Sequence, residues 1–120
     1  PMVLRRGKEG VPDRLVVYSL GNFISNMSRE HTDGGVMVKV VLGRKGLRRY
    51  IASAQYLLIY SSRYKNEQGK EDIRVVPAAS WSGKNQNSSF SVDSALIKYV
   101  NNTRLFLKGN NKEVEEYIFE

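Results

Sequence analysis

Two runs of alternating side chains, joined by a glycine-flanked turn, constrain this fold more than any other feature. From Val36 to Leu42, and again from Tyr50 to Tyr60 within the segment Leu47 to Tyr60, apolar or aromatic residues recur at every second position. Strand side chains point alternately to opposite faces, so this period is typical of a strand with one face in a core. The sequence therefore predicts a β-hairpin that turns at Gly43 to Gly46 and whose second strand bends or bulges. One face of that second strand is expected to hold Tyr50, Ala52, Ala54, Tyr56, Leu58 and Tyr60.

Two further segments are predicted to be strands. Leu15 to Leu20 is continuously apolar apart from Ser19, which is typical of a strand covered on both faces, so we expect it at the centre of a sheet. Ile73 to Val76 is expected to form a short strand that ends at Pro77, because proline cannot donate a ladder hydrogen bond. Polar residues at 63–72 and 80–91 predict exposed loops, the second of them containing Trp81.

After the second loop the period of the apolar residues changes from two to about 3.6, which predicts a helix. Ser91 is a candidate N-cap, and Gly109-Asn110 is a candidate stop. The last ten residues fit either a short helix or a terminal strand. The fold class expected is α+β, a mostly antiparallel sheet of four to six strands with one C-terminal helix packed on it, within a single domain over residues 1–120. The predicted helix stripe contains Val92, Leu96, Tyr99, Val100, Thr103, Phe106 and Leu107.

Composition bounds the class of protein. With 120 residues, 41% hydrophobic and 26% charged, the chain has the usage of an ordinary globular domain. No apolar run reaches the roughly 18 residues of a membrane span, so a soluble chain is expected. It contains no cysteine, which excludes disulfides and thiolate metal sites. Because the chain begins Pro1-Met2, we expect it to be a processed product or a piece of a longer protein.

Positive charge is concentrated in the first half of the chain. The net charge is +7, and residues 1–50 hold ten Lys or Arg against four acids. The densest cluster lies in the predicted hairpin turn and makes an anionic partner worth considering. The alternative is a charged turn that keeps sheet edges soluble. The anion-binding candidates are Arg44, Lys45, Arg48 and Arg49.

Catalytic motifs are sparse. The single histidine, His31, lies two residues before Asp33, but a catalytic zinc needs about three protein ligands. The nucleophile-elbow, phosphate-loop and dinucleotide glycine patterns are absent. We therefore predict no catalytic residue, metal ligand or cofactor within the chain. Basic residues do flank Tyr50 and Tyr64, but the signature of sheet-based RNA-binding modules is missing, so nucleic acid is not the favoured partner.

Two segments carry a resemblance to a known family. "VVYSLGNFIS", followed by "TDGGVMVKVVL", resembles the CapA-type poly-gamma-glutamate capsule biosynthesis proteins, which are related to calcineurin-like metallophosphoesterases. The resemblance implies the C-terminal part of an α/β/β/α sandwich, in a parent protein located at the bacterial cell envelope or outside the cytoplasm. It also implies a divalent metal held by upstream residues, an upstream domain as partner, and an anionic polymer as ligand.

The end of the resembling strand carries the candidate site of the parent protein. Gly21 can adopt a positive φ or approach a neighbouring backbone closely, and the Asn22 amide can both donate and accept hydrogen bonds near a substrate. The alternative for Asn22 is that it satisfies backbone groups at a strand end. A different class of function is also open, namely a stand-alone β-rich module that binds a polyanion or a protein. The candidate residues are Ser19, Gly21, Asn22 and Phe23.

Overall fold

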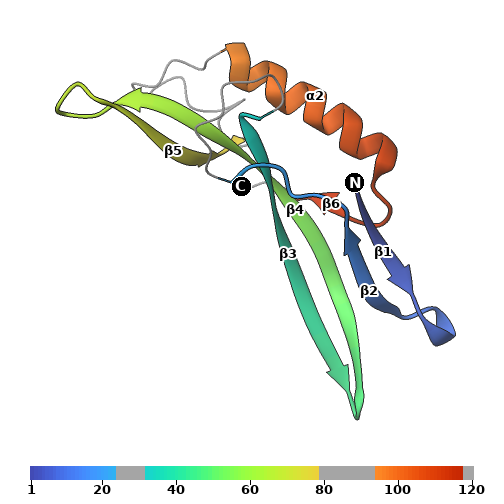
Figure 1. The fold of residues 1–120 in the computed structure, drawn as a ribbon. Helices are drawn as coiled ribbons and strands as arrows, with labels where there is room; N and C mark the ends of the chain where they lie inside the picture. The colour runs from blue at the N-terminus through green and yellow to red at the C-terminus, as the bar shows by residue number, and fades with distance from the viewer. Residues whose placement is uncertain (24–31, 79–93, 118–120) are drawn as a thin grey trace.

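The computed structural model describes residues 1–23, 32–78 and 94–117, and these residues have the α+β fold expected. One sheet pairs β1 with β2, and a four-stranded sheet has the order β3-β4-β5 with β6 paired to β4 (Figure 1). Every pairing is antiparallel except that of β6 with β4. The elements are β1 (Met2–Arg6), the 3-10 turn η1 (Lys8–Gly10), β2 (Pro12–Val17), β3 (Gly34–Lys45), β4 (Arg48–Lys65), β5 (Glu71–Pro77), α2 (Ser94–Asn110) and β6 (Glu115–Glu116).

The predicted hairpin is confirmed as β3 and β4, but the turn predicted at Gly43 to Gly46 is misplaced. β3 continues to Lys45 and β4 begins at Arg48, so the strands are longer than predicted and the turn is Gly46-Leu47. The register of the hairpin shifts at Val41/Leu42, because Val41 pairs with Ser53 whereas Leu42 pairs with Ile51. This bulge changes the predicted inward face: Ala52, the extra residue, is exposed, and Ile51 is buried in its place. The alternation holds beyond the bulge, where the buried members of the predicted face are Ala54, Tyr56, Leu58 and Tyr60.

The predicted strand at 73–76 is confirmed as part of β5, but the loop predicted at 63–72 is wrong in length. β4 continues to Lys65 and β5 begins at Glu71, so the turn spans only residues 66–70. Asn66 closes it, since its side-chain Oδ1 accepts hydrogen bonds at 3.0 Å from the amides of Gln68 and Lys70. Polar residues 63–65 and 71–72, which were predicted to lie in a loop, are therefore strand residues, because β4 and β5 pair there.

The expectation of a central strand at Leu15 to Leu20 is wrong. β2 ends at Val17 and has one strand partner, β1, which the sequence analysis did not predict. Beyond the strand, Tyr18 and Leu20 expose 63% and 50% of their surface. Apolar character alone does not show which chain segment covers a strand. Within the described residues Leu15, Val16 and Val17 are only partly buried, and Leu15 and Val17 pack against the core.

A single core lies between α2 and one face of the large sheet. The helix contributes Leu96, Val100 and Leu107, as the predicted stripe requires, and the sheet contributes mainly β4 residues. The stripe is wrong at Phe106, which is 54% exposed. The predicted stop at Gly109-Asn110 is confirmed, whereas Ser91 and Val92 lie outside the described residues.

The segment after the helix returns to both sheets. Lys112 and Met2 bond through their backbones, with Lys112 N to Met2 O at 3.0 Å, and Met2 is fully buried. The question left open for the last ten residues is settled for Glu115–Glu116, which form the short strand β6 on β4. His31, Trp81 and the predicted loop at 80–91 lie outside the described residues.

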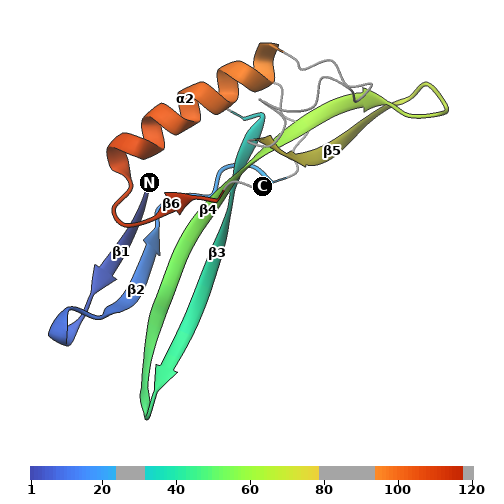
Figure 2. The ribbon, with the colours of Figure 1, turned by 180° about the vertical axis from the view of Figure 1, so that it is seen from behind.

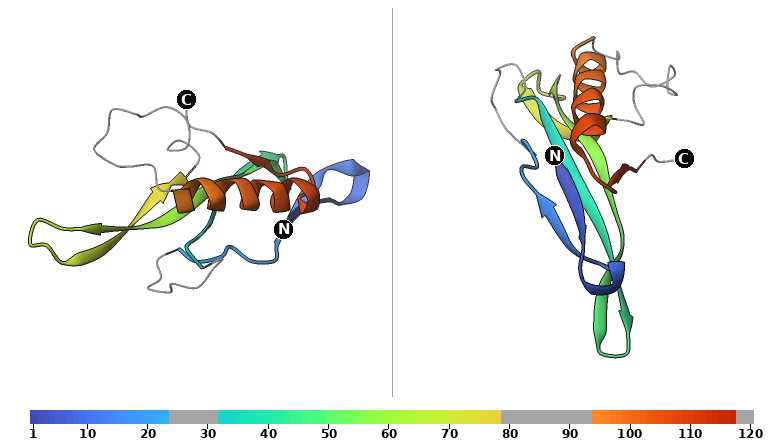
Figure 3. Two further views of the ribbon diagram at one scale, coloured as in Figure 1. Left: turned by 90° about the horizontal axis from the view of Figure 1, so that it is seen from above. Right: turned by 90° about the vertical axis from the view of Figure 1, so that its right-hand side faces the viewer.

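The molecule is elongated. Its extents are 56 × 25 × 24 Å and its radius of gyration is 17.1 Å, against about 14 Å expected for a compact domain of this length. The β1–β2 and β3–β4 hairpins point the same way, away from α2 (Figure 2). The helix lies beside only the part of β3 and β4 that is farthest from their turn (Figure 3). The far part of the hairpin is therefore an arm that projects beyond the helix.

Candidate functional site

A cleft of about 500 Å³ lies where the segment after β2 meets the start of β3 beneath the helix α2. Three parts of the chain form it, namely the N-terminal region, the first residues of β3 and one side of α2. Most of its lining is apolar, and among the described residues that line it there is no carboxylate, histidine or cysteine. The lining consists of Pro1, Ser19, Leu20, Gly21, Gly34, Gly35, Val36, Tyr99, Asn102, Thr103, Phe106 and Leu107.

Glycines make the floor of the cleft possible. Gly21 adopts φ +72°, and a methyl group on it would lie 2.9 Å from the Gly35 Cα. Gly35 is equally confined, because a methyl group there would lie 2.5 Å from the Leu20 carbonyl oxygen. The close approach allows the Val36 amide to donate to Leu20 O at 2.8 Å and the Asn22 amide to donate to Gly34 O at 3.1 Å. The chain after β2 thus becomes a short edge partner of β3.

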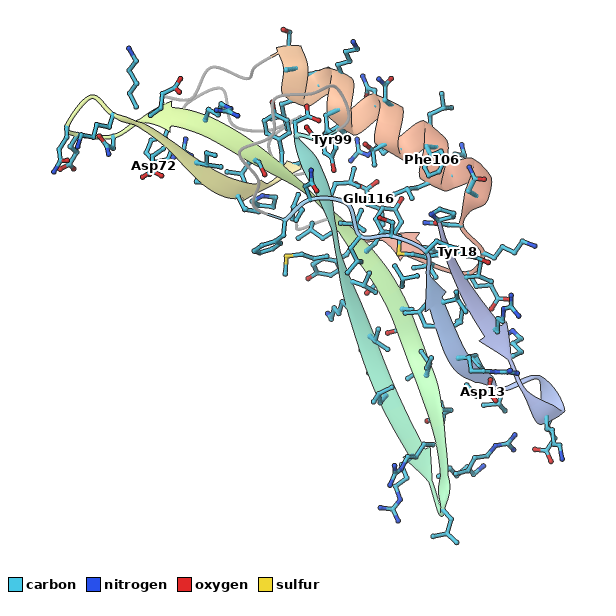
Figure 4. The ribbon with its side chains drawn as sticks, viewed as in Figure 1. Asp13, Tyr18, Asp72, Tyr99, Phe106 and Glu116 are labelled. Atoms are coloured by element: carbon cyan, nitrogen blue, oxygen red, sulfur yellow. The ribbon has the colours of Figure 1, made fainter. Side chains whose placement is uncertain are left out.

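Tyr99 joins the helix to this floor (Figure 4). Its hydroxyl donates to the Gly35 carbonyl at 2.8 Å, and its ring lies 5.6 Å from the ring of Tyr60, centroid to centroid. Burial raises the pKa of the Tyr99 phenol far above its ordinary value; the Thr103 side chain acts in the opposite direction, and Asp33 adds to the rise. At neutral pH Tyr99 is therefore a neutral donor that anchors the backbone.

The four predicted residues at the strand end lie together but have different roles. Ser19 and Gly21 line the cleft, and the Ser19 hydroxyl accepts a hydrogen bond of 3.2 Å from the Gly21 amide. The Asn22 side-chain amide donates to the Thr32 carbonyl at 2.9 Å, so this contact satisfies a backbone group. Phe23 is 55% exposed, and its carbonyl accepts from the Ser61 hydroxyl at 3.2 Å.

Sequence reasoning did not assign the helix side of the cleft to the site. Tyr99 and Thr103 were predicted only as part of the core-facing stripe, and Asn102 was not singled out. The signal that could have found them is a tyrosine and a threonine four residues apart, which share a helix face with apolar neighbours. Polar atoms on such a stripe need partners, and here the start of β3 supplies one for Tyr99.

The four predicted anion-binding residues lie at the β3–β4 turn, far along the arm from the cleft. Arg44 is paired with Arg49 across the strands, and Lys45 is paired with Arg48. Arg48 forms an ion pair with Glu9 of η1 and donates to the Lys8 carbonyl at 2.8 Å, which joins the two hairpins. Within residues 1–23, 32–78 and 94–117, no ion pair involves the other three cations.

A second, more polar cleft of about 420 Å³ lies between the end of α2 and β6. Arg104 donates to both carboxylate oxygens of Glu116, with the shortest contacts at 2.9 Å. This pairing raises the pKa of Arg104, while burial, together with Glu116, raises the pKa of Tyr56. The arginine is already neutralised by its partner, so this cleft is not a favourable site for an anion.

The described part of the chain holds no group of three His, Cys, Asp or Glu side chains placed to bind a metal ion. Nor does it contain a helix long and apolar enough to cross a bilayer. Comparisons with protein-family models, with curated proteins and with solved structures find no match for this chain. What the cleft offers chemically is binding, through a mostly apolar wall with a few hydroxyl and amide groups.

Proposed function

We propose that this chain is the C-terminal, non-catalytic portion of a CapA-type capsule biosynthesis protein, at the side of the fold that faces the substrate. The supporting observation is the meeting of Gly21 with Gly35 in an isolated bridge. These two glycines belong to the two segments that carry the resemblance, residues 16–25 and 32–42. Both glycines are required by close backbone contact, so the described residues of the two segments meet in one structural unit.

The chemistry is proposed to belong to the rest of the polypeptide. A divalent metal would be held by upstream residues, and the substrate would be an anionic polymer such as poly-gamma-glutamate at the bacterial envelope. The described residues of the cleft beside Gly21 include none suited to acid-base or nucleophilic work at neutral pH, because Ser19 has no base next to it among them and Tyr99 is held neutral.

Exposed apolar residues beside the cleft support a larger layered body. Tyr18, Leu20 and Phe23 each expose half or more of their surface, although they follow directly from the strand β2. Several large apolar side chains left exposed along one short segment are typical of a surface that another layer covers. In the proposed parent protein, the upstream domain packs here and completes the α/β/β/α sandwich, with α2 as one of its outer helices.

The substrate-facing role is tested by comparing two asparagines. Asn22 and Asn66 both bond to the backbone near a turn, but only Asn22 lies beside Gly21. In the parent protein, Asn22→Ala is expected to weaken handling of poly-gamma-glutamate about tenfold, as loss of a charge-assisted hydrogen bond does, whereas Asn66→Ala leaves it unchanged. Equal losses of stability in the two variants with unaltered polymer handling would show that Asn22 serves only the fold.

A second candidate is a stand-alone module that binds a polyanion or a protein, and the cations of the β3–β4 turn favour it. The two candidates are separated by titrating the chain alone with poly-gamma-glutamate and with an oligonucleotide over a salt series. Binding of both polymers, with affinity that falls steeply as salt rises, supports the module. Absence of binding by the chain alone supports a role that needs the rest of the parent protein.

A further inference from the structure

The β3–β4 hairpin ends in an unusual tip, defined here as residues 42–49. Leu42 and Leu47 expose 76% and 95% of their surface there. Turn positions are normally held by glycine, asparagine, aspartate, proline or serine, and Leu47 directly follows the turn glycine Gly46. The tip therefore presents two large apolar side chains to water. It lies at the far end of the projecting β3–β4 arm (Figure 1).

The same tip brings like charges together. Its cross-strand pairs, Arg44 with Arg49 and Lys45 with Arg48, are all cationic, and like charges directly opposite each other destabilise a sheet. Among the described residues, Arg48 alone of these four cations pairs with a carboxylate, that of Glu9 in the neighbouring hairpin. The contact with Glu9 also brings the η1 backbone to this end, since Arg48 donates to the Lys8 carbonyl.

Exposed leucines and opposed cations both cost free energy in water, and one environment offsets both costs. At the surface of an anionic bilayer, apolar side chains enter the boundary between head groups and acyl chains, and Lys and Arg lie against the anionic head groups. A hydrated polyanion would neutralise the cations but would leave Leu42 and Leu47 in water. The combination favours a lipid surface over a soluble polymer.

We propose that this tip docks the protein onto a membrane surface rich in anionic lipid, with Leu47 and Leu42 inserted and Lys45 and Arg49 against the head groups. The arm is formed by paired strands from Gly34 to Lys45, with one bulge at Val41/Leu42, so little ordering is needed on contact. The proposal does not depend on the resemblance to capsule biosynthesis proteins, because it uses only residues of the tip.

The test is co-sedimentation of the chain with vesicles of phosphatidylcholine containing 30% phosphatidylglycerol, an amount on the order of natural anionic membranes, with pure phosphatidylcholine vesicles for comparison. Lys45→Gln with Arg49→Gln is expected to weaken binding roughly 25-fold, about fivefold for each charge. Leu42→Ser with Leu47→Ser is expected to weaken it about tenfold or more. The matched control is Lys65→Gln with Lys70→Gln, the same loss of charge at the exposed β4–β5 turn, and it is expected to change binding less than about twofold.

Insertion is measured separately from binding. The chain has no cysteine, so Leu47→Cys gives a single position for an environment-sensitive fluorophore, whose emission should shift to the blue on anionic vesicles. The proposal is overturned if the chain does not co-sediment with anionic vesicles, or if the Lys65/Lys70 control loses as much binding as the Lys45/Arg49 variant. It is also overturned if the emission of the fluorophore at position 47 does not shift to the blue on anionic vesicles. It is also overturned if the leucine variant binds normally while soluble poly-gamma-glutamate competes through Lys45 and Arg49, because the tip would then be a polyanion site.

Discussion

Replacing Gly35 with alanine is expected to detach the segment after β2 from the sheet. The new methyl group would lie 2.5 Å from Leu20 O, 2.8 Å from Asn22 O and 3.0 Å from Asn22 N. All three atoms belong to the backbone, so no side-chain rotation can relieve the contact. Overpacking costs about 1–3 kcal/mol, and the weakening of two adjacent backbone hydrogen bonds adds about 1 kcal/mol each. Because these losses overlap, we expect the free energy of unfolding to fall by about 2–4 kcal/mol.

Urea denaturation of the chain measures the loss in free energy of unfolding. Hydrogen exchange at the Val36 and Asn22 backbone amides shows whether that loss arises where the segment after β2 pairs with β3. The matched control is Gly109→Ala, since a methyl group on Gly109 meets no atom within 4 Å and the residue lies in the last turn of α2. That change should raise stability by about 0.5 kcal/mol, because alanine is the better helix former. If Gly35→Ala were as stable as the unmodified chain, with both amides still protected, the close contact described for the cleft floor would be refuted.

Two further perturbations follow from the same contacts. Tyr99→Phe removes the bond to Gly35 O and should cost about 1–2 kcal/mol at pH 7 in a urea titration. Because burial raises the pKa of Tyr99 in the folded state, its contribution is complete below the ordinary tyrosine pKa of about 10 and is lost as pH rises above it. Above pH 10 the free energy of unfolding should therefore fall less steeply with pH in Tyr99→Phe than in the unmodified chain. Equal slopes in the two proteins would contradict the burial of the phenol. Glu116→Gln should cost about 1 kcal/mol, since Glu116 is 14% exposed and holds Arg104 through two oxygens. Glu113→Gln, which removes the exposed pair with Arg6, should change the unfolding midpoint much less, and an equal loss would contradict this ranking.

Local patterns predicted the elements that depend on nearby residues. The alternation from Val36 to Tyr60 requires one apolar face, and this is where β3 and β4 form and pair. The 3.6-residue period after Ser94 likewise places Leu96, Val100 and Leu107 in the core. Even there, a bulge that inserts Ala52 moved the inward position to Ile51, which depends on how the two strands fit together.

The candidate site was predictable only in part. Gly21 was expected to need a positive φ or a close neighbour, and it has both. Its neighbour, Gly35, is 14 residues away in the chain, and the helix residue that bonds there, Tyr99, is 64 residues from Gly35. No local sequence pattern links residues so far apart in the chain, because these contacts form only when the helix packs across the start of β3.

The sequence by itself determined the β3–β4 hairpin, the strand at 73–76 and the helix, because side-chain periodicity is a property of neighbouring residues. Only the tertiary structure decided what each face meets. It made Met2–Arg6 the partner of the apolar run from Leu15, which was expected in the middle of a sheet, and it placed Glu9 against Arg48. These outcomes depend on competition among long-range contacts for the same surfaces, and that competition is resolved only when the whole chain packs.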